Sequence, residues 1–169
     1  MSKPATPSSP LSAQTVKQLG TNIQTLRAVG GWTVRSLAPE CRMAFSSIHL
    51  LESALHGSPS LKTVDTVARV LGVTTGSLLG ASPQPRIRRQ GSISHVLAGN
   101  LVAARKSLKL SQEKLGELAG VSRTQIARLE AEERNPSVDT LARLAFALQT
   151  DVEELLTPRL PSEWSNACQ

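Results

Sequence analysis

The amino-acid sequence predicts an all-α protein built from two tandem five-helix domains. Three observations lead to this fold class. One ordered series of residues occurs twice along the chain, apolar residues recur at helical spacing between capping and turn residues, and aromatic residues make up only 2% of the sequence. The apolar content comes instead from Leu, Ala and Val, which suits small helical domains rather than a β-sandwich.

The repeat begins at Leu19–Arg27, which aligns with Leu97–Arg105 at an offset of 78 residues. The same offset carries Leu37, Ile48, Leu51 and Glu52 onto Leu115, Ile126, Leu129 and Glu130. After one additional residue in the first copy, an offset of 77 carries Pro59, Ser60, Leu78 and Leu79 onto Pro136, Ser137, Leu155 and Leu156. Chance matches of Leu do not explain an ordered series that includes Arg, Glu and Pro-Ser. We therefore interpret the chain as a tandem duplication.

The duplication predicts five segments. They are a flexible N-terminal segment (1–12), a first domain (13–80), a basic linker (81–93), a second domain (94–158) and a C-terminal tail (159–169). The linker is rich in Pro and Arg and has no apolar periodicity.

In the second domain we expect a first helix from His95 to about Leu108, with Leu97, Leu101 and Leu108 on one face. Ser111 can cap a second helix, whose core residues would be Leu115, Leu118 and Ala119. Gly120 tolerates the positive φ that often ends a helix.

Three further helices follow. Ser122 with Gln125 forms a capping box for the third, and Ser137 caps the fourth directly after Pro136. Thr150 with Glu153 predicts another capping box for the fifth.

The stretch Leu110–Glu130, with Arg134–Leu141 after it, resembles the phage repressor/Cro-type (XRE) helix-turn-helix family. The resemblance implies a lambda-repressor-like fold. It also implies that the second short helix lies across the DNA backbone while the third enters the major groove. The first domain is then a degenerate helix-turn-helix and the second is the DNA-binding one.

The resemblance assigns DNA contact to eight residues: Gln112, Ser122, Arg123, Thr124, Gln125, Arg128, Arg134 and Asn135. Helical spacing turns Ile126 and Leu129 inward and leaves the opposite side of the third helix exposed. Base reading would fall chiefly to Arg123, Thr124 and Arg128, because arginine can bond guanine O6 and N7 and a threonine methyl can pack on the thymine methyl. The alternative is that the two arginines are solvated surface charges.

Gln112 resembles the family glutamine that bonds a phosphate and braces the third helix, and Ser122 would act as cap and phosphate donor. Glu132 and Glu133 depart from the family pattern, because carboxylates there would repel phosphate. From His95 to Thr157 the chain holds eight Lys/Arg and nine Asp/Glu, so binding would depend on where the charges lie. The resemblance also implies a structural ion pair in each domain: Arg105 with Glu130, and Arg27 with Glu52.

The first domain loses much of this surface. Val34 replaces the phosphate-binding glutamine, and Pro39 should interrupt the second helix. Arg42 replaces the turn glycine, Ala44 replaces the capping serine, and Phe45, Ser46 and Ser47 replace Arg123, Thr124 and Gln125. With His49 also exposed, we expect a pairing or partner-binding domain; a second, divergent DNA reader is the alternative.

Other function classes find little support. The sequence shows no signal peptide, membrane span or catalytic cluster, and Cys41 and Cys168 lie too far apart in sequence to suggest a disulfide framework or a zinc site. His49, His56 and His95 have no neighbouring ligands at metal-binding spacing. We therefore expect no enzyme activity, no cofactor and no metal. The net charge of +6 favours polyanion partners.

The sequence thus predicts a cytoplasmic, nucleoid-associated regulator that binds double-stranded DNA sequence-specifically and represses by occupying an operator. The alternative is an antitoxin-like protein, in which partner binding is primary and DNA binding is autoregulatory. We expect either a homodimer or an intramolecular pseudo-dimer. Arg86, Arg88 and Arg89 in the linker could follow a DNA groove or could be solvated, and the sequence favours neither.

Overall fold

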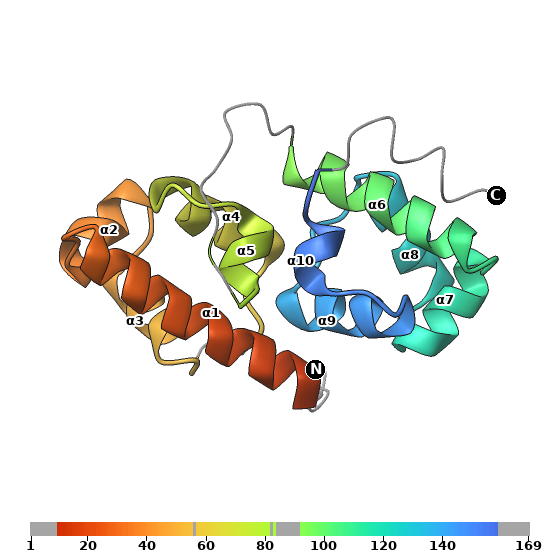
Figure 1. Ribbon diagram of the computed structural model, residues 1–169, viewed down its shortest axis with the longest axis horizontal. Helices are drawn as coiled ribbons and strands as arrows, with labels where there is room; N and C mark the ends of the chain where they lie inside the picture. Colours follow the sequence, from red (N-terminus) through yellow and green to blue (C-terminus); the bar gives the residue numbers. More distant parts are fainter. Residues whose placement is uncertain (1–9, 56, 82, 84–91, 159–169) are drawn as a thin grey trace, which may run out of the picture.

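The computed structural model describes residues 10–55, 57–81, 83 and 92–158, and this part of the chain is all-helical, as predicted. Its N-terminal half consists of α1 (Pro10–Val29), α2 (Val34–Glu40), α3 (Phe45–Glu52), α4 (Leu61–Val70) and α5 (Thr75–Leu79). Its C-terminal half consists of α6 (Ile93–Ser107), α7 (Gln112–Ala119), α8 (Arg123–Glu130), α9 (Val138–Ala147) and α10 (Val152–Leu155). Figure 1 shows the two halves side by side, with α5 and α10 facing each other between them.

The turns of the two halves follow the sequence repeat. Left-handed backbone conformation occurs at four matched pairs of positions in the described residues: Gly31 and Lys109, Arg42 and Gly120, Ala54 and Glu132, Gly72 and Gln149. Residues other than glycine rarely adopt a positive φ. The same unusual backbone conformation therefore recurs at equivalent turns of the two halves.

A buried asparagine closes each half in the same way. The Asn22 side chain donates hydrogen bonds of 2.9 Å to the carbonyl oxygens of Leu78 and Gly80. The Asn100 side chain donates to those of Leu155 and Thr157 at 2.9 and 2.8 Å. In each half the first helix thereby satisfies carbonyl groups at the end of the fifth, which would otherwise lack intrahelical donors.

Two predicted core residues are exposed. Leu118 on α7 is 51% exposed and Leu108, just after α6, is 38% exposed, whereas Leu115 and Leu101 are fully buried. The prediction was wrong for Leu118 because α7 is a short helix with only one narrow face against α8 and α9. Leu108 lies beyond the last turn of α6, where the chain leaves the helical face.

Two predicted helix boundaries also differ. Asp151, not Thr150, is the N-cap of α10 and makes no side-chain cap bond; the Thr150 hydroxyl instead donates to the Glu154 carboxylate. Pro39 does not interrupt α2, which continues to Glu40. Pro39 lies in the last turn of this short helix, so its missing N–H removes a single bond.

The N-terminus of α1 lies inside the segment that the sequence predicts to be flexible. This helix begins at Pro10, so it extends five residues beyond the position equivalent to the start of α6, and it packs against α9 of the other half. Figure 1 shows the N-terminal end of α1 beside α9 at the lower centre of the view.

The two halves meet through equivalent positions. Ser60 and Ser137 form an antiparallel β-bridge, in which Leu61 N–H donates to Pro136 O at 2.8 Å and Val138 N–H donates to Pro59 O at 2.9 Å. At the offset of 77 residues each bond is the counterpart of the other. The contact therefore has a local pseudo-two-fold axis that passes between the two serines, as in the isologous interface of a symmetric dimer.

Candidate nucleic-acid interface

Helix α8 is held in place from its inner side. Ile126 is fully buried and Leu129 is 2% exposed, as predicted. Glu130 at the end of α8 binds Arg105 of α6, with Arg105 Nε 2.6 Å from Glu130 Oε1 and Arg105 Nη2 3.1 Å from Glu130 Oε2. The predicted ion pair is thus formed, with both side chains largely buried.

The same carboxylate joins α7 to α8. Gln112 Nε2 donates to Glu130 Oε2 at 2.8 Å, while Arg105 Nη1 donates to the carbonyl oxygen of Leu110, just before α7, at 2.9 Å. Gln112 therefore has the bracing role that the resemblance implied. Its second Nε2–H and its side-chain oxygen make no hydrogen bond within the described residues, so both remain available to a ligand.

The N-terminus of α8 carries the predicted capping box. Ser122 Oγ accepts a bond of 3.2 Å from Gln125 N–H, and Gln125 Oε1 accepts one of 3.0 Å from Ser122 N–H. The Gln125 oxygen is thus committed to the cap, and its Nε2 is the group available for contact. The backbone amides of Arg123 and Thr124 lie in the first turn, where they have no intrahelical acceptor and add to the positive end of the helix dipole.

Arg123, Thr124 and Arg128 are exposed together on the outer side of α8. Among the described residues, no ion pair is formed by either arginine. Two guanidinium groups and a hydroxyl therefore face solvent on a helix whose opposite side is fixed. Such a surface can donate to acceptors on base edges and phosphates.

The turn between α7 and α8 depends on two glycines. Gly120 has φ of 63°, which ends α7, and a Cβ on Gly116 would lie only 2.7 Å from the carbonyl oxygen of Val121. Arg143 of α9 fastens this turn, because its Nη1 donates to the carbonyl oxygens of Ala119 and Gly120 at 3.2 and 2.9 Å. Sequence reasoning did not identify Arg143, since no local pattern links it to a turn 23 residues away.

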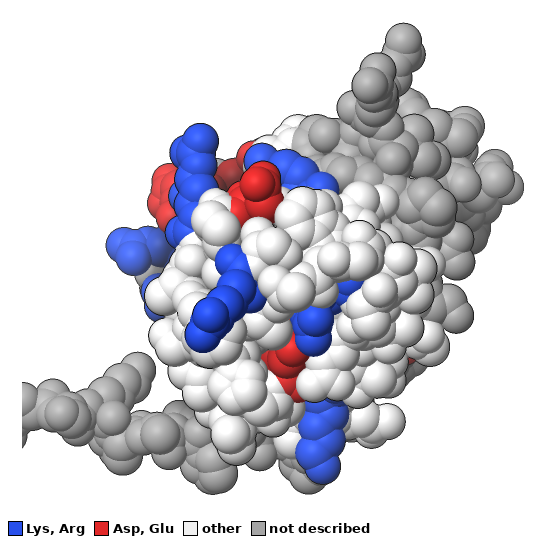
Figure 2. Space-filling view, turned by 90° about the vertical axis from the view of Figure 1, so that its left-hand side faces the viewer, with Lys and Arg blue, Asp and Glu red and all other residues white. Residues whose placement is uncertain are grey.

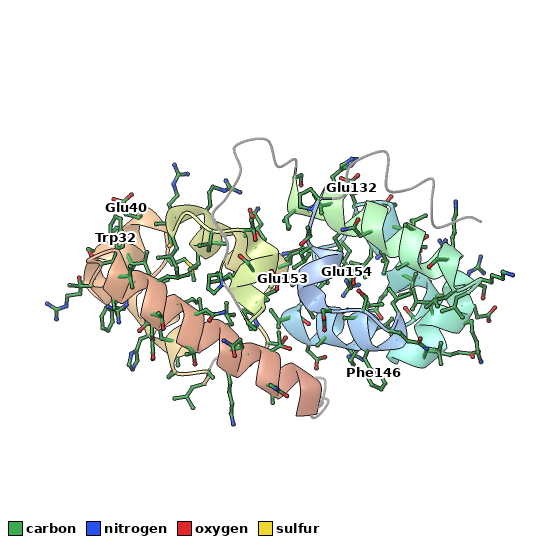
Figure 3. The ribbon with its side chains drawn as sticks, in the orientation of Figure 1. Trp32, Glu40, Glu132, Phe146, Glu153 and Glu154 are labelled. Carbon is green, nitrogen blue, oxygen red and sulfur yellow. The ribbon has the colours of Figure 1, made fainter. Side chains whose placement is uncertain are left out.

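Arg134 and Asn135, in the loop after α8, are both predicted to contact DNA, but they differ in their contacts within the protein. Arg134 is exposed, but the side-chain oxygen of Asn135 accepts a bond of 3.1 Å from Lys62 N–H of the other half. Of the two acidic residues that depart from the family pattern, Glu132 bonds His95 Nδ1 on α6 at 2.7 Å, and Glu133 is exposed. Figure 3 shows Glu132 beside α6. The sequence suggested no partner for His95, and this partner lies 37 residues away.

The equivalent surface of the N-terminal half differs in chemistry although its scaffold is similar. Arg27 and Glu52 form the predicted pair, with Arg27 Nε 2.6 Å from Glu52 Oε1. Ala44, however, provides no side-chain cap to α3, as expected. Phe45 is 50% exposed and stacks on His49 with ring centroids 6.2 Å apart. Figure 2 views this end of the molecule, where Lys and Arg side chains are separated by a mainly uncharged surface.

Three further features are the linker arginines, metal binding and membrane-spanning helices. Arg86, Arg88 and Arg89 lie outside the described residues. Within the described part of the chain, no group of three or more His, Cys, Asp and Glu side chains is placed to hold a metal ion. None of the helices found there has the length and apolar character needed to cross a membrane.

Comparison with known proteins places this geometry in a family. Residues 101–155 match the helix-turn-helix family. The chain is 46% identical over 65 residues to the control protein C.SmaI from Serratia marcescens, an alignment that covers 38% of this chain and 77% of that protein. It is 36% identical over 60 residues to an uncharacterised helix-turn-helix transcriptional regulator from Haemophilus influenzae, covering 36% of this chain and 61% of that one.

Among solved structures, a hypothetical transcription factor, NHTF, from Neisseria is similar with a TM-score of 0.41 and 26% identity, over 49% of this chain and 93% of that chain. The sequence matches by themselves decide the assignment, and the family match runs from within α6 to the end of α10. This chain belongs to the XRE-type helix-turn-helix family of DNA-binding transcriptional regulators.

Proposed function

We propose that the protein recognises a specific duplex sequence through α8 and represses transcription by occupying its operator. In this proposal Arg123, Thr124 and Arg128 read base edges, while Ser122, the amide group at the start of α8 and Arg134 bind phosphates. Gln112 would donate the second N–H of its carboxamide to a phosphate, while the first orients α8 through Glu130.

The observation that carries the proposal is the combination of a fixed inner side and an unpaired outer side on α8. Ile126 and Leu129 are buried, and Glu130 is bound by both Arg105 and Gln112, so the helix can present its side chains in one orientation. Arg123 and Arg128 on its outer side make no ion pair among the described residues. A pre-oriented helix loses little freedom when it enters a groove.

Occupancy is the simplest mode of action for such a surface. The described residues include ten helices, all of them parts of two similar halves, and the proposal needs no further element. A reporter gene tests the mode: a binding site that overlaps the promoter should lower expression, and a site placed upstream should leave expression unchanged. Increased expression from the upstream site would instead make the protein an activator.

Selection of bound sequences from random duplexes, followed by binding of Arg123→Ala and Arg128→Ala variants, tests the reading helix. Each loss should cost about 1–3 kcal/mol and relax preference at particular base pairs. Arg35→Ala, which removes an exposed arginine from α2, is the matched control and should leave base preference unchanged. Uniform weakening by Arg123→Ala and Arg128→Ala on every duplex would reduce these residues to phosphate contacts.

A protein contact through α3 is the second candidate, favoured by the exposure of Phe45 and of Leu55, which is 76% exposed. In that case Phe45→Ser would abolish regulation in cells while DNA affinity in vitro stays the same. A loss of DNA affinity in the Phe45→Ser variant would show that α3 lies on the duplex instead.

A further inference from the structure

The contact between the two halves is symmetric in its backbone but not in its side chains. Around the bridge of Ser60 and Ser137, Lys62 N–H donates to the side-chain oxygen of Asn135 at 3.1 Å, and Asp139 N–H donates to Ser58 Oγ at 2.6 Å. These two bonds join equivalent positions, because Lys62 corresponds to Asp139 and Ser58 to Asn135. Each acceptor, however, is a different residue type.

The difference matters most where α5 meets α10. Gly76 and Glu153 occupy equivalent positions in the two halves and face each other across the pseudo-two-fold axis. A Cβ on Gly76 would lie 2.8 Å from the carbonyl oxygen of Glu153, and a Cβ on Gly80 would lie 2.1 Å from Glu153 Oε2. The Glu153 side chain thus fills the space beside Gly80, while the Glu153 backbone and the Leu156 side chain lie against Gly76. Figure 3 shows Glu153 between α5 and α10.

Neither half could form this contact with a copy of itself. In a pair of C-terminal halves, Glu153 and Thr157 would replace Gly76 and Gly80 opposite Glu153, where the contact now leaves no room for a Cβ. In a pair of N-terminal halves, Gly76 would replace Glu153 opposite Gly76 and Gly80 and leave the space empty. The first arrangement is disfavoured by sterics, and the second by lost packing.

We propose that Glu153, with its backbone against Gly76 and its side chain seated on Gly80, makes the two halves select each other and exclude a second copy of the chain. The N-terminal half thereby covers the surface of the C-terminal half that carries Ser137 and Glu153. The protein is then a monomer that presents one α8. This proposal concerns pairing alone and does not depend on DNA binding.

The mass of the full chain in solution is the first test. Sedimentation equilibrium over a wide range of concentrations should give the monomer mass of 18.0 kDa. A concentration-dependent approach to twice that mass would overturn the proposal, whether two chains pair through equivalent halves or exchange halves.

Hydrogen exchange at the bridge tests the role of the glycines. Gly76→Glu should speed exchange of the Leu61 and Val138 amides by about tenfold or more, because the new side chain cannot fit against Glu153. Gly57→Glu is the matched control: a Cβ at Gly57 meets nothing within 4 Å, so the same change of charge should leave these amides protected. Equal protection in both variants would overturn the proposal.

Two variants at Glu153 keep the test informative if Gly76→Glu fails to fold. Glu153→Gly should speed exchange at the bridge, because it empties the space beside Gly80. Glu153→Gln should retain protection, because it keeps the size of the side chain. Unchanged exchange in Glu153→Gly would show that this side chain does not hold the halves together.

Discussion

Helices α3 and α8 hold equivalent places in the two halves, and they differ almost entirely on the outer side. Both are anchored by a buried Ile and Leu and by a glutamate bound to an arginine of the first helix. On the outer side, Phe45 and Leu50 of α3 stand where Arg123 and Arg128 stand on α8. The comparison teaches that the residues maintaining a helix-turn-helix scaffold and those on the outer side, which we propose read DNA in α8, can change independently, because they project from opposite sides of one helix.

The ion pair that occurs in each half should have the largest effect on stability. Glu130→Ala should destabilise the fold by about 3 kcal/mol, because it leaves the largely buried Arg105 without its partner. Glu52→Ala should cost somewhat less, since Arg27 is more exposed than Arg105. Urea denaturation followed by circular dichroism measures both values. If Glu52→Ala were neutral, the two scaffolds would not be maintained in the same way.

Arginines can be placed on α3 at the positions equivalent to Arg123 and Arg128. This change tests whether the outer side of α3 can read DNA. Phe45→Arg with Leu50→Arg should lengthen the sequence selected from random duplexes, because α3 would gain donors for guanine at the second end of the molecule. Each useful contact should add about 1 kcal/mol of discrimination. Phe45→Ser with Leu50→Ser is the control that removes the apolar groups without adding donors. An unchanged selected sequence in the arginine variant would show that α3 does not approach DNA.

The turn before the third helix of each half should have the next largest effect on stability. Gly120 and Arg42 both have positive φ, of 63° and 52°. Gly120→Ala should therefore destabilise the protein by about 1 kcal/mol, and Arg42→Gly should stabilise it by less, because glycine also raises the entropy of the unfolded chain. Thermal denaturation would compare the two. A stable Gly120→Ala variant would imply that the turn has shifted to another conformation.

The helix caps should show a similar but smaller asymmetry. Ser122→Ala removes the bond to Gln125 N–H and should cost about 1 kcal/mol. Ala44→Ser supplies the missing cap of α3 and should recover up to about the same amount. Chemical denaturation of the two single variants and of the double variant measures the difference. Equal stability of the Ala44→Ser variant and the original protein would mean that α3 begins elsewhere in solution.

Cys41 should give the smallest effect, and only at alkaline pH. Burial raises the pKa of the Cys41 thiol, and the nearby charge of Glu40 raises it further. The unfolded state then loses its proton at lower pH than the folded state. Stability present below the ordinary thiol pKa of about 8.5 is therefore lost as the pH rises through and above that value. Cys41→Ala, which installs the residue found at the equivalent Ala119, should remove this loss in pH-dependent denaturation.

Much of the C-terminal half could be predicted from the sequence because its signals are local. The capping box of Ser122 and Gln125, the left-handed Gly120 and the inward side of α8 depend on residues within one or two helical turns. The ion pair of Arg105 and Glu130 followed from a family pattern rather than from spacing. The core prediction failed at Leu118, where apolar character alone does not show which side of a short helix is covered.

The predicted DNA contacts remain proposals, but the structure divides them by what is still available. Arg123, Thr124, Arg128 and Arg134 are exposed, whereas Gln112, Gln125 and Asn135 each have one side-chain atom already bonded within the protein. The sequence could not make this division, because two of the three partners lie on other helices or in the other half.

By itself, the sequence determined the helices of the C-terminal half, most of their caps, the turn at Gly120 and the side of α8 that faces outward, because each depends on side chains a few residues apart. Only the tertiary structure decided that Ser60 pairs with Ser137, that Glu153 lies against Gly76 and Gly80, and that Glu132 binds His95. These contacts join residues far apart in the chain, and their geometry depends on how whole helices pack. No periodicity or capping pattern carries that information.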